Sequence, residues 1–448
     1  MPDLIREAAR SGVVVFHEEV ARDGSQGKTL MLGQHRVSLA KRHSSILGAN
    51  ASRQLVFNAG FPSCGTEEFE AVRQVMSEVD CCYVGASGRA TRDEAHLLLR
   101  AVEGARFGRV SVAVPTSVAM CATMLHKPPP ACIDDAVAIV KILMDAGTAS
   151  CVDFALVDAT RSDVGFVADA ASRLTEAGAS MIIICDTVGA LFPAESRRLF
   201  SQLVARASAE VTFVVHMHND LGFGLANTLE ALSCGIRGVT GSWLSLGERA
   251  GMPATEQLLF ALGHEPERLP ERMGIKADIW IERPNLRAIV PVARYVSQVT
   301  GREILVTDPI VGTGVNSIST GTPFVNPTLF QPYDPLSILG IGPTILLTPL
   351  ASRRIVVAVA SRLGCRLSSA DVDRALSWVK SESFDRGVGV IDEADFAQFL
   401  EELGYPASSC ASVQGPALLS AAVGNRTDHV ERTGDRPSSA NMAHRHVK

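Results

Sequence analysis

The chain contains 448 residues, with 42 basic and 48 acidic side chains, so its formal net charge is -6 at pH 7. This balance argues against a nucleic-acid-binding protein that relies on a basic face. Hydrophobic residues make up 46% and charged residues 20%, a composition typical of folded domains with a large aliphatic core. Because 448 residues exceed the usual size of one domain, we expect a large domain followed by a smaller one.

Neither a membrane span nor a secretion signal is predicted. The most apolar segment, 345–360, is interrupted by Pro349, Arg353 and Arg354. The first ten residues mix acidic and basic side chains and lack the apolar centre of a signal peptide. The ten cysteines include no C-x-x-C pair, so buried free thiols are favoured over a thiolate metal site or a disulfide framework. The sequence therefore predicts a cytoplasmic protein without a membrane partner.

Short runs rich in β-branched residues alternate with segments of helical periodicity along the first part of the chain. The runs predict eight strands, at 13–16, 55–57, 81–84, 110–114, 152–156, 181–185, 211–215 and 238–243. Between them, Phe69, Val72 and Val79 share one helix face, and a later helix, which we expect Asp134 to cap, begins before Val137. Eight such units in about 250 residues predict a (β/α)₈ barrel. A doubly wound sheet is the alternative, but no G-x-G-x-x-G follows the first strand.

Beyond the barrel the pattern changes, and we expect three parts. Residues 1–270 form the catalytic barrel. Residues 271–423 form a loop-rich linker and a small helical domain, with helices at 351–363, 369–381 and 393–403. Residues 424–448 have almost no apolar side chains and are expected to be a disordered tail.

Polar residues at the ends of the first and seventh strands predict a metal site. In a (β/α)₈ barrel the carboxyl ends of the strands line the active site. His216 and His218 are two residues apart, so they share a strand face, and Asp23 follows the first strand. Two imidazoles and a carboxylate form a three-ligand site that leaves positions open for substrate. The alternative is a chance pair of partly exposed histidines, which the barrel context disfavours.

Several sequence motifs at these strand ends resemble those of one metal-dependent family. They are Arg22-Asp-Gly-Ser-Gln26, Asp158-Ala-Thr-Arg161, Asp186-Thr-Val-Gly189, His216-Met-His218-Asn-Asp and Gly247-Glu-Arg-Ala-Gly251. Together, and in this order, they are similar to the family that contains isopropylmalate synthase, homocitrate synthase, the Re-face citrate synthases and hydroxymethylglutaryl-CoA lyase. The resemblance covers roughly residues 10–265.

The resemblance implies an acyltransferase that condenses acetyl-CoA with a 2-oxo acid, with Mn²⁺, Co²⁺, Zn²⁺ or Mg²⁺ bound by Asp23, His216 and His218. It implies that Arg22 stabilises charge on the keto oxygen and that Thr187 binds the substrate carboxylate. Further residues are then candidates for catalysis, substrate binding or support of the ligands: Gln26, Asn58, Arg161, Asn219, Asp220 and Glu248. The resemblance also implies a homodimer.

Some positions depart from the family pattern. The family usually carries Glu where this chain has Asn58 and Val157, and His where it has Met120 and Pro323, so no general base can be named. Loss of two carboxylates favours an acceptor with a second acidic group, such as oxaloacetate, phosphonopyruvate or phosphinopyruvate. Only 7 of the 42 basic residues are Lys, a pattern typical of high-GC genomes, in which antibiotic biosynthesis through phosphinomethylmalate or phosphonomethylmalate synthases is common.

Three alternatives remain at this point. The first is a homocitrate or isopropylmalate synthase. The second is a retro-Claisen lyase. The motif at 247–251 disfavours it, because this motif is the one typical of the synthases. The third is a non-catalytic relative that keeps only the metal site.

Overall fold

The computed structural model describes residues 3–147, 151–276 and 278–405. Its internal contacts divide the chain into two compact units, Met1–Ser317 with Tyr333–Pro343, and Ile318–Pro332 with Thr344–Lys448. The predicted domain limits at 270 and 423 stay predictions, and the predicted tail, 424–448, lies outside the described residues.

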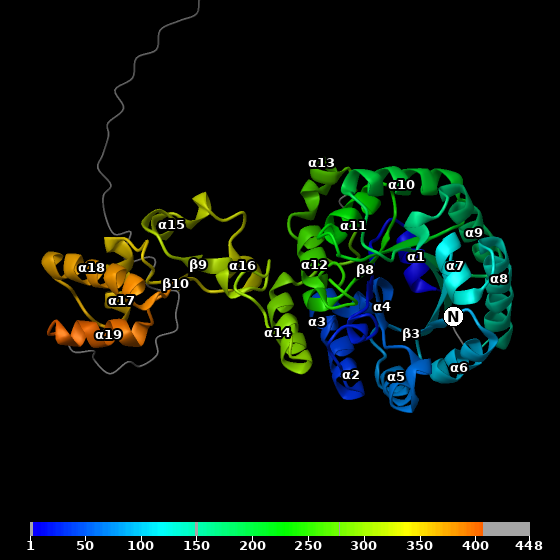
Figure 1. The fold of residues 1–448 in the computed structure, drawn as a ribbon, viewed down its shortest axis with the longest axis horizontal. Helices are drawn as coiled ribbons and strands as arrows, with labels where there is room; N and C mark the ends of the chain where they lie inside the picture. Colours follow the sequence, from blue (N-terminus) through cyan, green and yellow to red (C-terminus); the bar gives the residue numbers. More distant parts are fainter. Residues whose placement is uncertain (1–2, 148–150, 277, 406–448) are drawn as a thin grey trace, which may run out of the picture. The chain divides into compact units, whose positions relative to one another are not determined.

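The first unit contains a closed barrel of eight parallel strands, in which each strand pairs with the next and β8 pairs with β1 (Figure 1). The strands are β1 Val15–Glu18, β2 Leu55–Asn58, β3 Tyr83–Arg89, β4 Gly108–Pro115, β5 Cys151–Val157, β6 Met181–Asp186, β7 Phe213–Met217 and β8 Gly238–Gly241. Each overlaps one predicted strand, and the predicted (β/α)₈ barrel is confirmed.

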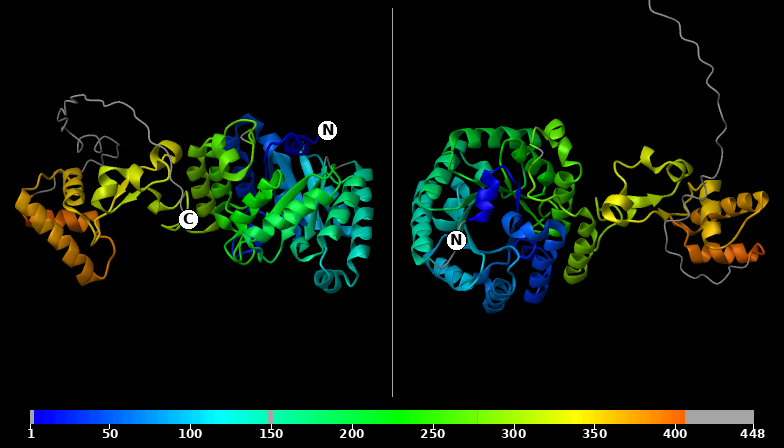
Figure 2. Two further views of the ribbon diagram at one scale, coloured as in Figure 1. Left: turned by 90° about the horizontal axis from the view of Figure 1, so that it is seen from above. Right: turned by 180° about the vertical axis from the view of Figure 1, so that it is seen from behind.

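Helices surround the strands as an outer ring (Figures 1 and 2). The first unit contains these helices, of which not all belong to the ring: α1 Leu4–Arg10, α2 Gly33–Arg42, α3 Ser44–Leu47, α4 Ala51–Gln54, α5 Thr66–Glu78, α6 Arg92–Val102, α7 Val118–Leu125, α8 Pro129–Ala146, α9 Val164–Glu176, α10 Pro193–Arg206, α11 Gly224–Ser233, α12 Thr255–Gly263, α13 Leu269–Met273, α14 Ile289–Thr300 and α16 Pro335–Leu339.

One predicted helix start is wrong. Helix α8 begins at Pro129, so Asp134 lies inside the helix and does not cap it. Proline suits the first helical turn because the N–H group that it lacks has no partner there. Asp134 instead forms an ion pair with Arg173, at 2.5 Å.

The interior of the barrel forms a separate apolar cluster from the core between strands and helices. Val15, Val56 and Val214 are buried in it, together with Ile5 and Ala8 of α1. Because side chains alternate along a strand, the intervening residues face the helices. In Figure 2, α1 lies inside the ring of helices. Its buried apolar side chains, which also include Ala9, pack against the strand residues of this cluster.

A buried cluster of charges also stabilises this part of the barrel. Arg109 is fully buried, and its Nη2 donates to Asp153 Oδ1 at 2.7 Å, while Nη1 donates to Asp3 Oδ1 at 2.9 Å. Arg109 Nε also donates to Asp153. Ser180 Oγ donates to Asp3 at 2.7 Å. A buried guanidinium is tolerated only when carboxylates neutralise it, so these contacts join α1 to the strands above it.

The second unit is small and mostly helical. It contains α15 Gly321–Val325, β10 Thr344–Ile345, α17 Arg353–Arg362, α18 Ser369–Arg386 and α19 Glu393–Glu402, and the boundary with the first unit falls within the short strand β9 Ser317–Ile318. The last three helices overlap those predicted. Val356, Ala375 and Phe396 form the centre of its own apolar core. No helix among the residues described in either unit is long and apolar enough to span a bilayer.

Candidate metal centre and active site

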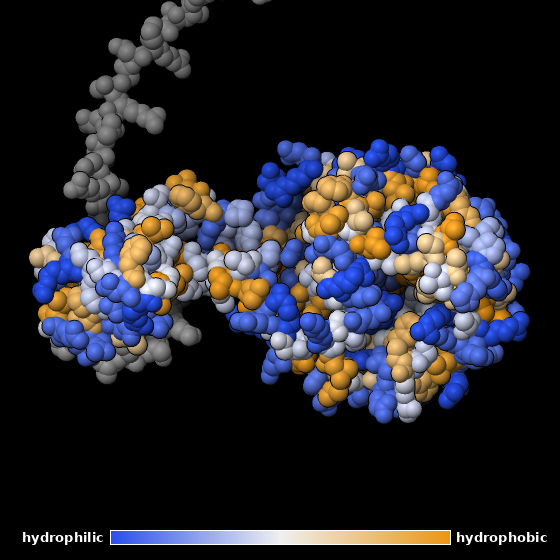
Figure 3. All heavy atoms as spheres, in the orientation of Figure 1, coloured by the Kyte–Doolittle hydropathy of each residue, from blue (hydrophilic) through white to orange (hydrophobic). Residues whose placement is uncertain are grey.

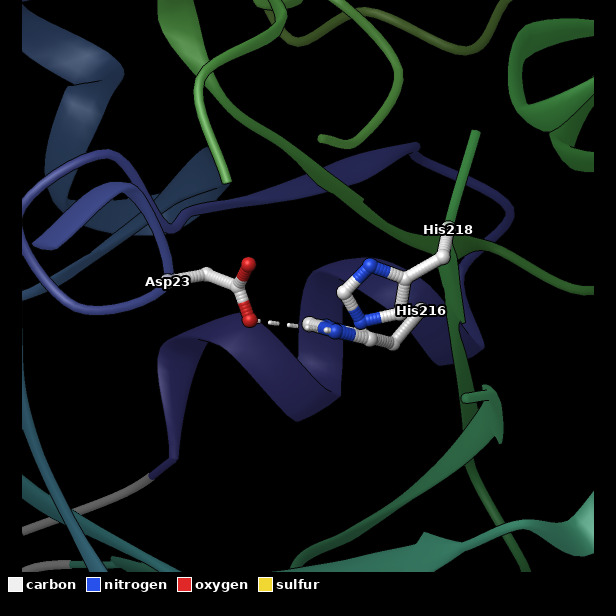
Figure 4. A group of neighbouring side chains, drawn as sticks. All are labelled: Asp23, His216 and His218. Atoms are coloured by element: carbon white, nitrogen blue, oxygen red, sulfur yellow. Dashed lines mark ion pairs between the residues drawn. The ribbon is translucent and has the colours of Figure 1, made fainter. Parts of the chain in front are cut away.

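Three predicted ligands meet at the carboxyl-terminal mouth of the barrel. Asp23 follows β1, His216 lies in β7, and His218 lies one residue beyond the end of that strand. Figure 4 shows Asp23 on one side and the two imidazoles on the other, with their side chains pointing toward one another. The fold brings them together because β1 and β7 both pair with β8, and because parallel strands end at the same mouth.

The geometry of this triad suits a divalent ion. The candidate ligand atoms all lie within 4.8 Å of one another, and within the described residues no other His, Cys, Asp or Glu group of three does so. His216 Nε2 lies 3.8 Å from Asp23 Oδ2. Ligands about 2 Å from one ion are about 3 to 4 Å apart, so little movement is needed. His218 Nδ1 is buried without a hydrogen-bond partner, as expected of a nitrogen placed for a ligand.

The charges around the triad favour its metal-binding protonation states. Arg22 Nη1 donates to Asp23 Oδ2 at 2.7 Å. Burial alone would raise the pKa of Asp23, but the Arg22 guanidinium keeps it below its usual value. Burial and the neighbouring His218 lower the pKa of His216 to about 3. At neutral pH the site therefore offers an anionic carboxylate and a neutral imidazole.

The loop after β8 holds the second oxygen of Asp23. The backbone N–H of Glu248 donates to Asp23 Oδ1 at 3.0 Å, whereas the Glu248 side chain points to Arg249, with 3.4 Å between Oε2 and Nη1. Glu248 therefore supports the triad through its backbone. Arg249 in turn donates to both carboxylate oxygens of Asp220 and, at 2.6 Å, to the carbonyl oxygen of Thr187.

The other predicted site residues also lie at strand ends. Thr187 Oγ1 accepts from Asp158 N at 2.8 Å, so its hydroxyl hydrogen remains available to a substrate. Arg161 donates to both oxygens of Asp158, and half of its side chain is exposed. Asn219 Oδ1 accepts from Gly224 N at 3.0 Å, which ties it to the start of α11. Gln26 is exposed at the end of the short 3₁₀ helix Gly24–Gln26.

A buried carboxyl group that sequence reasoning missed lies beside Asn58. Asn58 Nδ2 donates to Glu19 Oε2 at 3.0 Å and to Ser87 Oγ at 2.8 Å. Glu19 follows β1 and is 4% exposed, and burial raises its pKa to about 7 although Arg22 and Asn58 oppose the shift. The carboxyl group expected at position 58 is thus supplied by the neighbouring strand, and with a pKa of about 7 it carries part of a negative charge at neutral pH. The signal in the sequence was an acidic residue directly after an apolar run.

Comparison with known proteins agrees with this geometry. A family model described as HMGL-like matches residues 16–288, more than half of the chain. The chain belongs to the HMGL-like family. Curated relatives include the 2-isopropylmalate synthase of Solidesulfovibrio magneticus, 29% identical over 397 residues that span 87% of this chain and 74% of the relative. The 2-isopropylmalate synthase of Pyrococcus furiosus is 28% identical over 95% of this chain and 83% of its own.

Among solved structures, the hydroxymethylglutaryl-CoA lyase of Pseudomonas aeruginosa shares the fold of this HMGL-like chain. It superposes with a TM-score of 0.51 at 18% sequence identity, and the match covers 64% of this chain and 93% of the lyase. The predicted family and the predicted enzyme class, an acyltransferase of the synthase kind, are confirmed by the family match and the curated relatives.

Proposed function

We propose that the protein condenses acetyl-CoA with a 2-oxo acid and releases free CoA. The observation that carries this proposal is the Asp23, His216 and His218 triad with the Arg22 guanidinium 2.7 Å from Asp23. In the reaction, the methyl carbon of acetyl-CoA loses a proton and bonds to the keto carbon, the keto oxygen gains a proton, and water cleaves the thioester. The synthase relatives support this assignment.

Each part of the site has a role in this reaction. Asp23, His216 and His218 would hold a divalent ion, which supplies a Lewis acid for the keto group. Arg22 places a fixed positive charge where the keto oxygen becomes negative as the carbon–carbon bond forms. The hydroxyl group of Thr187 donates to the carboxylate of the 2-oxo acid, and the half-exposed Arg161 adds positive charge at the same mouth.

A thiol-release assay tests the proposal. Free CoA would be measured from acetyl-CoA with oxaloacetate, 2-oxoglutarate, 2-oxoisovalerate and phosphonopyruvate, with chelator and with each of Mn²⁺, Co²⁺, Zn²⁺ and Mg²⁺. Thiol release that needs both a metal and one acceptor supports the synthase, and the preferred acceptor separates the isopropylmalate and homocitrate alternatives. Acetyl-CoA formed from a hydroxyacyl-CoA indicates the lyase instead. If neither reaction occurs under any condition, both the synthase and the lyase are contradicted, and the non-catalytic alternative remains.

For the acceptor, we propose a 2-oxo acid with a second acidic group. Asn58 and Val157 support this choice because they stand where the resembling synthases carry Glu. Glu19 opposes it, since its carboxyl group lies within 3.0 Å of the Asn58 amide and returns negative charge to this side of the mouth. The preference for a dianionic acceptor is therefore expected to depend on Glu19.

Above about pH 8, where the Glu19 carboxyl group is ionised because its pKa is about 7, replacing Glu19 with glutamine is expected to raise kcat/KM for oxaloacetate about tenfold relative to 2-oxoisovalerate, because about 1.4 kcal/mol of charge repulsion is removed. Steady-state thiol release with both acceptors measures the ratio. Glu230→Gln, a change on the outer helix α11, serves as the control. A ratio that Glu19→Gln leaves unchanged would sink the charge argument while leaving the condensation reaction intact.

We also propose that the active form is a homodimer. Large apolar side chains are exposed on the segments that follow four strands, three on loops and one at the start of α7: Leu30 (66%), Val118 (73%), Phe192 (53%) and Leu221 (51%). Figure 3 shows apolar groups, in orange, among the charged surface of each unit. A second copy that covers the mouth would bury them. Sedimentation equilibrium should give twice the chain mass of 47.6 kDa, and a monomer at micromolar concentration would contradict the proposal.

A further inference from the structure

The loop between β8 and α12 has an unusual backbone. Leu244, Ser245 and Arg249 adopt left-handed φ angles of 56°, 59° and 56°. Residues with a Cβ atom rarely adopt this conformation, because the side chain crowds the backbone, and they keep it only where their surroundings fix it. Three such residues in six positions therefore imply strong anchors on either side of the loop.

Two buried carboxylates anchor the start of this loop. Glu256 Oε2 accepts from Leu244 N at 3.0 Å, so it holds a left-handed residue directly. Glu18 Oε1 accepts from Trp243 N at 3.2 Å, and its Oε2 accepts from Thr255 Oγ1 at 2.6 Å. Glu18 and Glu256 are 1% and 2% exposed. None of these contacts involves the triad, so the two carboxylates act on the loop.

The far end of the loop fixes the triad. A Cβ atom on Gly247 would lie 2.8 Å from Asp23 Oδ1, so only glycine allows the backbone to approach this closely, and the next N–H, that of Glu248, donates to the same oxygen. Gly251 O accepts from Asn219 N at 2.9 Å, directly after His218. The loop thus contacts the chain at both sides of the triad.

We propose that Glu18 and Glu256 are positioning residues, which hold the left-handed loop so that the Glu248 N–H group orients Asp23 as a metal ligand. The inference rests on the proposed function, since it assumes that the triad binds a divalent ion. Partners that orient a ligand commonly change metal affinity 10 to 100-fold when they are removed. The partner of Glu256 in the loop is the neutral N–H group of Leu244. Burial, reinforced by nearby Glu18, raises the pKa of Glu256 to about 7.

Mn²⁺ titration by calorimetry, on chelator-treated full-length protein, tests the inference without any turnover. Glu256→Ala is expected to weaken Mn²⁺ binding at least tenfold, and Glu256→Asp similarly, because the shorter side chain cannot reach Leu244 N. Glu256→Gln keeps an accepting oxygen and should bind within threefold of wild type. Glu230→Ala on α11 is the matched control. Circular dichroism shows whether each variant is folded.

The outcomes separate the two proposals. Wild-type protein that binds no Mn²⁺ contradicts the metal assignment itself. Wild-type protein that binds Mn²⁺, with folded Glu256→Asp and Glu256→Ala binding equally well, overturns the positioning role alone. If Glu256→Ala does not fold, the Mn²⁺ affinities of Glu256→Asp and Glu256→Gln are compared instead. Equal Mn²⁺ affinity in these two folded variants overturns the positioning role, because only glutamine keeps an oxygen that reaches Leu244 N.

Discussion

Replacing His218 with alanine is expected to lower metal-dependent thiol release at least about 1000-fold. The change removes one of three ligands, and a loss of about 4 kcal/mol of transition-state stabilisation corresponds to that factor. His218 is 4% exposed, and its Nδ1 has no hydrogen-bond partner that the change to alanine would leave unpaired. Initial rates over a range of Mn²⁺ concentrations measure the effect.

A histidine far from the mouth provides the control for this change. His96 is exposed on α6, and His96→Ala should retain the wild-type rate and Mn²⁺ affinity. If His218→Ala keeps its rate within about threefold of wild type at every Mn²⁺ concentration, the triad is not the metal site that the reaction uses.

Replacing Arg109 with methionine is expected to lower the free energy of unfolding by about 3 to 5 kcal/mol. Methionine fills much of the space, but it leaves Asp153, which is 1% exposed, without its buried cation. Asp3 loses two hydrogen bonds at the same time. Urea unfolding followed by circular dichroism, in the presence of chelator, measures the change.

A substitution of a surface arginine serves as the control for Arg109→Met. Arg197 is 60% exposed and pairs with Glu230, so Arg197→Met should cost less than about 1 kcal/mol. An Arg109→Met protein that loses no more than this control would show that the cluster does not stabilise the barrel. Because Arg109 lies at the opposite end of the barrel from the triad, the folded variant should still bind Mn²⁺.

The barrel and its metal triad could be predicted from the sequence because they depend on local patterns. Alternation placed His216 and His218 on one face, and the order of strands and helices placed Asp23 at the same mouth. The eight apolar runs marked the strands because parallel barrel strands are buried on both faces. The start of α8 was misjudged because Asp134 resembles a cap, whereas Pro129 and Pro130, five and four residues earlier, begin the helix.

Contacts between distant residues could not be predicted in this way. Glu19 and Asn58 are 39 positions apart, and Glu18 and Thr255 are 237 apart, so no local pattern reports either hydrogen bond. The left-handed backbone of Leu244 was equally hidden, since leucine carries no preference for it. For this reason the charge argument, which counted lost carboxylates at Asn58 and Val157, missed the carboxyl group that Glu19 places beside Asn58.

Arg249 has a consequence for how the acceptor preference of such a barrel can evolve. One guanidinium joins the carbonyl oxygen of Thr187 after β6, the carboxylate of Asp220 after β7 and its own loop after β8. Substitutions at residues that share a network have effects that do not add. A mutation in any one of these loops thus changes the background on which the other two are selected. Substitutions in these three loops would therefore have non-additive effects on acceptor preference, so the effect of each would depend on the order in which they arise.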